Sequence, residues 1–552
     1  MSLQRLVLAV VLVSGSLCST RFAHGEERPK LVVVVSVDQL CQEYLQRFGA
    51  NLNDQGFYRM VEKQGAHYAN CHHSHAFTHT GPGHSGQMTG AHPNMHGIIG
   101  NIWFDRASGK NLYCVADPAE TTIGATDIQG PCSPKNMLAT TVGDMLKLST
   151  DRQGKVFGVA LKDRAAILMT GRLADAAYWF EEREGVWVTS SYYRQDRDLP
   201  GYIRAFNTNH YADRFAGQEW KLLYDDACYH HDEPDDYAAE NPPSELGRTF
   251  PHKLAPAGKT LYAQLRSTPM GNDMTLDVAR EVIVHEQLGE DAIPDLLCVN
   301  LSSNDYAGHA YGPHSLEVED ITYRTDLQLR AFHDWLADHL QHQNFVLIVT
   351  SDHGVCPLPE LMKEKGLIAG RDPLGNDSEV AVKLEAVLRD KLALEKMPVS
   401  KLVQFVEPNQ VYFDHSTLAG EELRAARVLT RDWLISQPGV FCAATYDELL
   451  SGRVGGPFGD ALVKSFHPHR SGDVLWIFDP YFISGDKGTT HGSPWSYDTH
   501  VPLLLVGQGI APGKHHERVC PAAIAPTVAE LLGIEAPPSC FEEPLAKALK
   551  NH

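Results

Sequence analysis

Aspartate and histidine residues follow three short apolar segments of this chain. Asp38 follows LVVVVSV, Asp305 and His309 follow DLLCVNL, and Asp352 and His353 follow FVLIVTS. Carboxylate oxygens and imidazole nitrogens are common zinc ligands, and a zinc ion in a protein usually has four ligands in a tetrahedral arrangement. Five such residues are too many for one tetrahedral ion. The pattern therefore predicts two metal ions.

His491, which precedes Gly492 in a predicted loop, is a further expected metal ligand. Asp305 and His309 are four residues apart, which places both side chains on one side of a helical turn. Each residue also has a simpler interpretation, because an aspartate can cap a helix and a histidine can pack in a core. Their shared position after predicted strands favours metal binding.

Thr80 is the candidate nucleophile. It stands in THTGPGH, where Gly81 and Pro82 are expected to open a helix. A hydroxyl at a helix start faces free backbone N–H groups and the positive end of the dipole, which favour a bound phosphate and an alkoxide. The alternative is a threonine that only caps the helix. A threonine needs a base or a metal for activation, so the predicted metal ligands favour the catalytic interpretation.

Lys162 and Arg164 follow a fourth apolar segment, VFGVAL. A phosphate monoester carries two negative charges, which a guanidinium and an ammonium match in geometry and charge. A diester has one negative charge and a second bulky substituent. The pair therefore favours monoesters, and the alternative is a polar strand end at the surface, where ion pairs are common and weak.

The segments that must position these side chains are buried apolar runs separated by helical patterns. Such runs are typical of parallel strands, and ligands of α/β sheets bind outside the carboxyl ends of the strands. We therefore expect an α/β fold with a central, largely parallel sheet flanked by helices. Helices are predicted over about 40–66, 274–288 and 315–340, and over PKNMLATTVGDMLKLS, where Leu138 and Val142 share a face.

Two segments interrupt this alternation and are interpreted as insertions. Residues 188–260 are rich in Tyr, Trp, Asp and Pro without a sustained period, and residues 357–485 contain helical patches that predict a small α+β lobe. Residues 26–552 then form one catalytic domain that carries both insertions.

Residues 1–25 have the charged, apolar and small-residue regions of a secretory signal peptide, with a retained membrane anchor as the alternative. We therefore expect a periplasmic or secreted protein without stable membrane insertion after cleavage. Ten of the eleven cysteines would remain, and disulfides are permitted in such a compartment. The pairs Cys114/Cys132 and Cys520/Cys540 are the better candidates, while Cys298 is expected to be a buried thiol.

The formal net charge of −21 argues against nonspecific binding of nucleic-acid polymers, which depends on clustered Lys and Arg. Cleavage would take it to −23, because it removes Arg5 and Arg21 and no acid. An anionic substrate must then be attracted by local positive charge, which Lys162, Arg164 and two divalent ions would supply.

These motifs together resemble the alkaline phosphatase superfamily, which includes nucleotide pyrophosphatase/phosphodiesterases. The resemblance runs from about residue 29 to 540, through VDQL, THTGPGH, IIGNIW, LKDR, SSNDYAGHAYGP, TSDHG and THGSPWSYDTHVPLLL, and is strongest to single-chain alkaline phosphatases with a threonine nucleophile. Phosphodiesterase relatives generally lack the Lys/Arg pair. The C/S-x-P-x-R stretch of sulfatases is absent around Thr80.

The resemblance implies the role of each site residue. One zinc ion is expected on Asp305, His309 and His491, and the other on Asp38, Asp352 and His353 beside Thr80, which also counts among the metal-contacting residues. Asn101, Lys162 and Arg164 are expected to bind the phosphate. His72, His73, His75, His79 and His84 are expected to be supporting or loop residues, as are His314 and His500.

The sequence therefore predicts a two-zinc alkaline phosphatase that hydrolyses small phosphate monoesters through a phosphothreonine intermediate. A nucleotide phosphodiesterase is the first alternative. An exported zinc-binding protein without catalytic activity is the second.

Overall fold

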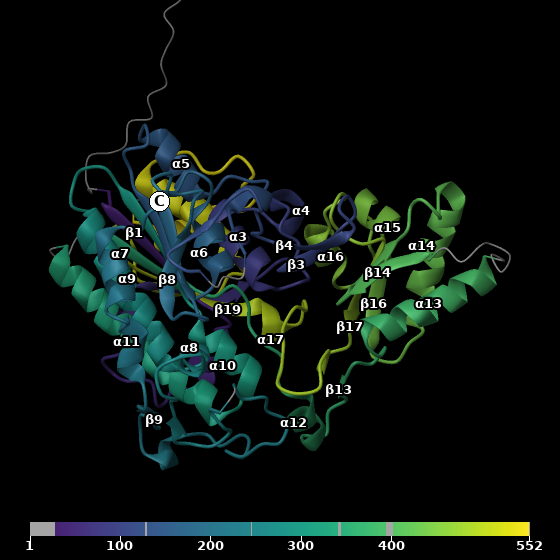
Figure 1. Ribbon diagram of the computed structural model, residues 1–552, viewed down its shortest axis with the longest axis horizontal. Coiled ribbons are helices and arrows are strands. Elements are labelled where there is room, and N and C mark those ends of the chain that lie inside the picture. Colours follow the sequence, from purple (N-terminus) through teal and green to yellow (C-terminus); the bar gives the residue numbers. More distant parts are fainter. Residues whose placement is uncertain (1–27, 127–129, 244, 341–343, 393–400, 551–552) are drawn as a thin grey trace, which may run out of the picture.

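The computed structural model describes residues 28–126, 130–243, 245–340, 344–392 and 401–550 (Figure 1). The expected signal peptide, residues 1–25, lies outside this part. No helix within the described ranges is both long enough and apolar enough to cross a membrane.

A ten-stranded sheet forms the centre of the larger body, in the order β20-β2-β19-β12-β1-β11-β6-β7-β8-β5. Its five middle strands are parallel to one another. They are β12 (Phe345–Thr350), β1 (Leu31–Val37), β11 (Asp295–Leu301), β6 (Val156–Ala160) and β7 (Ala176–Glu181). The predicted α/β class is confirmed, and β1, β11 and β12 are apolar because both of their faces are buried.

The outer strands make the sheet mixed. Antiparallel pairs join β12 to β19, β19 to β2, β7 to β8 and β8 to β5, while β2 and β20 are parallel. These strands are β19 (His500–Gly507), β2 (Ala66–His72), β20 (Gly513–His515), β8 (Val186–Ser190) and β5 (Thr122–Ile123).

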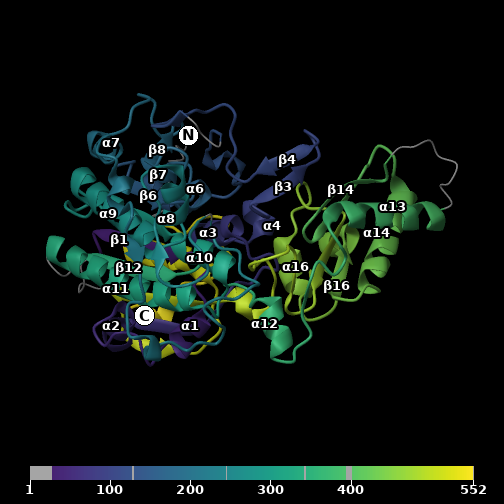
Figure 2. The same ribbon diagram turned by 60° about the horizontal axis from the view of Figure 1, so that its bottom comes forward.

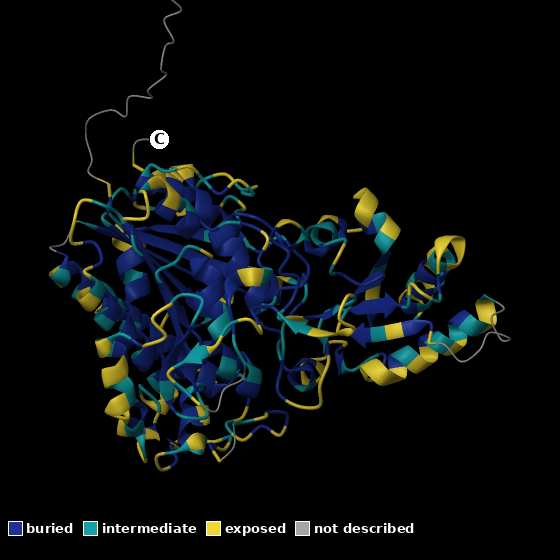
Figure 3. Cartoon of the chain, turned by 45° about the horizontal axis from the view of Figure 1, so that its top comes forward, coloured by how far each residue is buried: buried dark blue, intermediate teal, exposed yellow. Residues whose placement is uncertain are grey.

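Helices cover both faces of the sheet and create two hydrophobic cores. Val33 and Val35 of β1 pack in the core under α1 (Gln42–Arg47), α2 (Phe57–Gln64), α9 (Pro269–Glu286) and α11 (Leu316–His339). Val32 and Val34 pack on the opposite face with α5 (Val142–Ser149) and α18 (Ile524–Leu532). Figure 3 shows this buried centre and the exposed outer sides of the helices.

Two helices differ from the sequence-based expectation. The segment 40–66 contains two short helices, α1 and α2, rather than one. The helix expected over PKNMLATTVGDMLKLS begins only at Val142, because Thr141 and Asp144 form a capping box there. Leu138 therefore lies outside that helix and is 52% exposed.

A lobe at the side of the larger body is built on a second, antiparallel sheet (Figure 2). Its order is β14-β15-β17-β16. The strands are β14 (Val403–Glu407), β15 (Gln410–Phe413), β17 (Val474–Phe478) and β16 (Val440–Thr445), and α13 (Asp377–Lys391) and α14 (Gly420–Ile435) share their core. The boundaries 188–260 and 357–485 given to the two insertions stay a prediction.

The ten cysteines of the described part are all free. Neither Cys114/Cys132 nor Cys520/Cys540 is joined, so the structure does not contain the disulfides that the sequence suggested. Cys298 is a buried thiol, as expected.

Candidate active site

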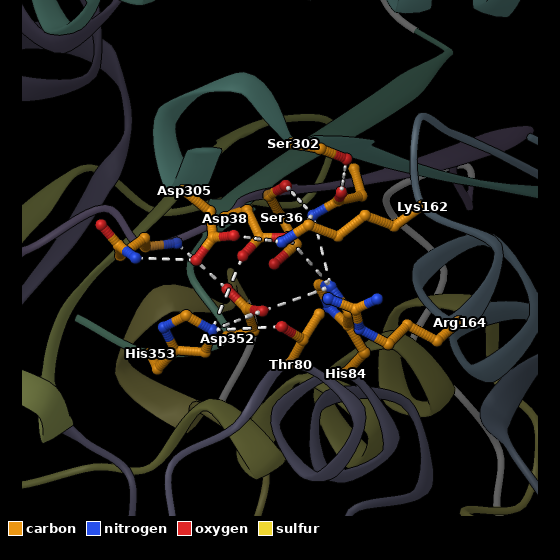
Figure 4. Close-up of polar contacts among 12 residues, drawn as sticks. Ser36, Asp38, Thr80, His84, Lys162, Arg164, Ser302, Asp305, Asp352 and His353 are labelled. Carbon is orange, nitrogen blue, oxygen red and sulfur yellow. Dashed lines mark hydrogen bonds and ion pairs between the residues drawn. The ribbon is translucent and has the colours of Figure 1, made fainter. Parts of the chain in front are cut away.

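The predicted site residues meet at one edge of the central sheet. Asp38 follows β1, Lys162 follows β6, Asp305 lies in α10 (Ser303–Tyr311) after β11, and Asp352 follows β12. These four strands are direct neighbours, in the order β12-β1-β11-β6. Their carboxyl ends therefore bring together side chains that are far apart in the sequence (Figure 4).

Asp38, Asp352 and His353 form one ligand group, which we call the threonine-side group. Their ligand atoms lie within 4.8 Å of one another. His353 Nε2 lies 3.6 Å from Asp38 Oδ1 and 3.3 Å from Asp352 Oδ2. Asp38 Oδ1 and Asp352 Oδ2 are buried without a hydrogen-bond partner in the described part. Unpaired buried carboxylate oxygens fit a bound cation, because they are costly without one.

Asp305, His309 and His491 form the second ligand group, which we call the outer group. His309 Nε2 lies 3.2 Å from Asp305 Oδ1, and His491 Nε2 lies 3.7 Å from the same oxygen. The Nδ1 atoms of these histidines lie 2.7 and 2.6 Å from the carbonyl oxygens of Thr489 and Thr78. A proton on Nδ1 suits these contacts and leaves Nε2 free to bind a metal ion.

Lys162 connects the two groups. Its buried ammonium donates to Asp38 Oδ2 at 2.8 Å and to Asp305 Oδ2 at 2.5 Å. Burial alone would raise the pKa of Asp38. The attraction of the Lys162 ammonium contributes to the opposite effect, and the pKa of Asp38 lies below its ordinary value. The pKa of Asp305 is lowered for the same reason. Both carboxylates therefore keep the charged form that a metal ligand needs.

The other members of the threonine-side group respond differently to burial. Burial, with the charge of Asp38 next, raises the pKa of Asp352 well above its ordinary value. Burial also lowers the pKa of His353 to about 3, so that its imidazole is neutral at physiological pH. A neutral imidazole is the metal-binding form of histidine. A cation at this group would also offset the cost of ionising Asp352.

Thr80 is the first residue of α3 (Thr80–Thr89), and His79 occupies the N-cap position. The Thr80 hydroxyl lies 3.4 Å from His353 Nε2 and is almost completely buried. Because the capping position belongs to His79, the geometry favours the nucleophile interpretation of Thr80 over the capping interpretation.

The expected phosphate-binding residues lie beside the start of this helix. Asn101 Oδ1 accepts a hydrogen bond from Gly81 N at 2.8 Å, which ties the IIGNIW loop to the turn that carries Thr80. Arg164 is the second residue of α6 (Asp163–Thr170), and its Nη1 lies 3.4 Å from the hydroxyl of Tyr113. Arg164 Nε has no hydrogen-bond partner among the described residues, which leaves donor capacity for an anion.

Supporting residues that the sequence did not single out complete the site. Gln39 Nε2 donates to Asp305 Oδ1 at 2.7 Å, and Asn300 Nδ2 donates to Asp38 Oδ2 at 3.3 Å. Asp498 accepts hydrogen bonds from the backbone N–H groups of Gly492 and Ser493, beside His491. Gln39 stands in VDQL and Asn300 in CVNL, so the one available signal was their position beside predicted strand ends.

Of the expected supporting histidines, His84 lies at the site, whereas His314 and His500 do not. His84 is completely buried at the site, with Nε2 3.4 Å from Asp352 Oδ2. His314 instead contacts Arg47 and Asp232, and His500 stacks on His72. Neither of the latter two makes a described contact with the two ligand groups.

Comparison with protein families matches residues 32–493 to the model described as type I phosphodiesterase / nucleotide pyrophosphatase. The chain belongs to this family. It lies in the alkaline phosphatase superfamily, as the motifs indicated. The match includes every residue of the two ligand groups, together with Thr80, Asn101, Lys162 and Arg164.

The similarity to known relatives extends along almost the whole chain. A Myroides odoratus protein named calcium-transporting ATPase is 35% identical over 535 residues, which cover 95% of each chain. The alkaline phosphatase PafA of Elizabethkingia meningoseptica is 34% identical over 552 residues, which cover 98% of each chain. A crystal structure of wild-type alkaline phosphatase PafA has a TM-score of 0.87 at 32% identity, covering 95% of this chain and 100% of that one.

Proposed function

We propose that this phosphoric monoester hydrolase is a two-zinc alkaline phosphatase that works through a phosphothreonine intermediate. The observation that carries the proposal is the position of Thr80 beside the threonine-side group, with Lys162 bridging that group and the outer group at one sheet edge. The similarity to PafA along the full chain supports the same reaction class.

Two zinc ions fit the residues that are present. The threonine-side group offers two unpaired buried carboxylate oxygens and one imidazole, and the outer group offers one carboxylate and two imidazoles. Such oxygen and nitrogen donors suit zinc. When bound, the ions would supply Lewis acidity for the attacking and the leaving oxygen.

The nucleophilic attack and the binding of the phosphoryl group are assigned to residues of the chain. Thr80 Oγ1 would attack phosphorus and form a new O–P bond while the ester O–P bond breaks and the alcohol leaves. Water would then cleave the Thr80 phosphoester, release inorganic phosphate and restore the hydroxyl. Lys162, Arg164 and Asn101 would hold the nonbridging oxygens during both steps, which is electrostatic stabilisation by groups already in position.

A nucleotide phosphodiesterase is the second candidate, because the family description names that activity. Lys162 and Arg164 oppose it, since two cations suit a dianionic phosphoryl group better than a monoanionic diester. An exported zinc-binding protein without activity is opposed by the Thr80 hydroxyl, which lies 3.4 Å from His353 Nε2.

The deciding experiment compares two esters with one leaving group. We expect the purified protein to hydrolyse para-nitrophenyl phosphate with a much higher kcat/KM than bis-para-nitrophenyl phosphate, with zinc content measured on the same sample. A preference for the diester would support the phosphodiesterase instead. No turnover by zinc-loaded protein would support the non-catalytic alternative.

The proposal includes the location and partners of the enzyme. The signal-like residues 1–25 favour the periplasm or the exterior of the cell, where small phosphate esters would be the substrates. N-terminal sequencing of the protein from a cell envelope fraction tests this location. We expect the mature protein to lack the signal-like residues.

A further inference from the structure

A third group of metal-binding side chains lies outside the two groups of the active site. It consists of His92, Cys520 and Glu542, which we call the C-terminal group, and its ligand atoms lie within 4.8 Å of one another. It shares no residue with the threonine-side group or the outer group. The mechanism proposed above assigns it no role.

The C-terminal group has the chemistry and spacing of a zinc site. His92 Nε2 lies 3.3 Å from Glu542 Oε1. Ligands in a tetrahedral zinc site, each about 2.0–2.3 Å from the ion, lie about 3.3–3.8 Å from one another. A thiolate, an imidazole and a carboxylate are all zinc ligands, and the thiolate disfavours calcium and magnesium.

Burial supplies a second observation. His92 is 4% exposed, and its Nε2 lies 3.3 Å from Glu542 Oε1 without forming a hydrogen bond of good geometry in the described part. Cys520 is also 4% exposed. A buried polar atom without a hydrogen bond is costly, so a ligand that satisfies it is expected.

A neighbouring cavity can supply a fourth ligand. The cavity has a volume of about 620 Å³ and is lined by Cys520 and Glu542, together with Ser74, Arg518 and Lys547. This volume is large enough for several water molecules, one of which can complete a tetrahedral ion.

The group connects the end of α3 with two segments near the C-terminus. His92 follows α3 and precedes α4 (Pro93–His96), Cys520 precedes the 3-10 helix Pro521–Ala523, and Glu542 belongs to the C-terminal segment. That segment already docks on the end of α3, because Phe541 N donates to Gly90 O at 2.8 Å. Helix α3 begins with Thr80, so an ion here would fix the C-terminal end of the helix that carries Thr80 at its N-terminus.

We propose that His92, Cys520 and Glu542 bind a structural zinc ion that fastens the C-terminal segment to α3. Cys520 binds as the thiolate and releases its proton to solvent, His92 binds through Nε2, and Glu542 through a carboxylate oxygen. The ion contributes to folding stability and takes no part in the chemistry at Thr80.

A disulfide between Cys520 and Cys540 is the competing possibility. The two states exclude each other, because a sulfur in a disulfide is no thiolate ligand. Both cysteines are free in the structure, and the Cys540 thiol faces the carbonyl oxygen of Glu542 at 3.3 Å.

Cobalt substitution isolates this site from the active site. Cobalt(II) bound to a thiolate has an intense near-ultraviolet charge-transfer band, and neither active-site group contains a cysteine. We expect the fully loaded wild-type protein to show this band. Cys520→Ser should abolish it, and Glu542→Gln should weaken it or lower the cobalt affinity. Cys442→Ser, which removes a half-buried thiol in the lobe, is the matched control and should leave the band unchanged.

Metal content and stability give two further measurements. The wild type should bind one zinc ion more per chain than Cys520→Ser, and zinc should raise the Tm of the wild type by more than that of the variant. Equal metal content, a missing cobalt band, a band that survives in Cys520→Ser, or a Cys520–Cys540 disulfide in the purified protein would each overturn the proposal. None of these measurements depends on turnover, so the proposed function is tested separately.

Discussion

The imidazole rings of His353 and His491 stack with their centroids 3.5 Å apart and an angle of 14° between their planes. His353 belongs to the threonine-side group and His491 to the outer group, so the two ligand groups are in direct contact. Metal ions in catalytic pairs lie about 3.5–4 Å apart, and adjacent ligand groups are a requirement for such a pair. The stacking therefore supports the proposal that the two groups hold neighbouring ions.

Thr80→Ala should reduce kcat for a monoester by at least about a thousandfold, which is typical for the loss of a nucleophile. Acid-quenched reactions should contain no covalent phosphate on the protein, because the remaining side chains form no phosphothreonine. Thr80→Ser should keep substantial activity, and both variants should bind zinc, since the Asp and His ligands are intact. Unchanged activity in Thr80→Ala would rule out this nucleophile.

Metal removal should abolish activity, and added zinc should restore it, because both ligand groups suit zinc. Asp305→Asn should empty mainly the outer group, and His353→Ala mainly the threonine-side group. Metal analysis of each variant would then give about one ion fewer than the wild type. Activity supported by magnesium alone would contradict the assignment.

The double substitution Lys162→Ala/Arg164→Ala should reduce monoesterase activity while sparing diesterase activity. Loss of one charge-assisted contact costs about 1.5–3 kcal/mol, or one to two powers of ten in kcat/KM. Lys135→Ala is the control, because its side chain is largely exposed and its ion pair is with Asp117, which belongs to neither ligand group. An equal fall of both activities would refute the role given to the pair.

Glu407 in the lobe should make stability depend on pH. Burial raises its pKa from 4.5 to about 7, against the hydrogen bond that the Tyr412 hydroxyl donates to it. Between these values the folded protein binds more protons than the unfolded chain, so this group reduces stability as pH rises from 4.5 to about 7. The loss amounts to about 3 kcal/mol at most.

Glu407→Gln should therefore be more stable than the wild type at pH 8 by about 1–3 kcal/mol, with a much smaller difference near pH 4.5. Urea unfolding at both pH values measures this, and Glu421→Gln, at an exposed position, serves as the control. A variant that is less stable than the wild type at pH 8 would show that the hydrogen bond with Tyr412 outweighs the buried charge.

Sequence patterns predicted the charged residues of the candidate site because these residues follow apolar strands whose ends must meet. Asp38, Asp305 and Asp352 each carry that signal. Gln39 and Asn300 do not, because neutral amides are common in turns and strands, and their contacts with Asp305 and Asp38 arise only when β1 and β11 pair. The C-terminal group was missed for a similar reason, since its members have no shared motif.

Local signals also limited the fold prediction. The long central strands, α9 and α11 have sustained patterns, and their expected positions agree with the structure within a few residues. The start of α5 was placed too early, because Thr141 and Asp144 form a cap that overrides the apolar spacing before Val142. Periodicity describes a buried face, whereas a helix start depends on a particular hydrogen bond.

The four central strands that end at the site have a consequence for variation among related enzymes. Neighbouring strands lie about 4.8 Å apart, a distance set by backbone hydrogen bonds and independent of the side chains. Asp352, Asp38, the segment before Asp305, and Lys162 leave β12, β1, β11 and β6 in that order. Segments outside these strands, such as the lobe, can therefore change in length and composition while the spacing of the groups at the strand ends stays constant.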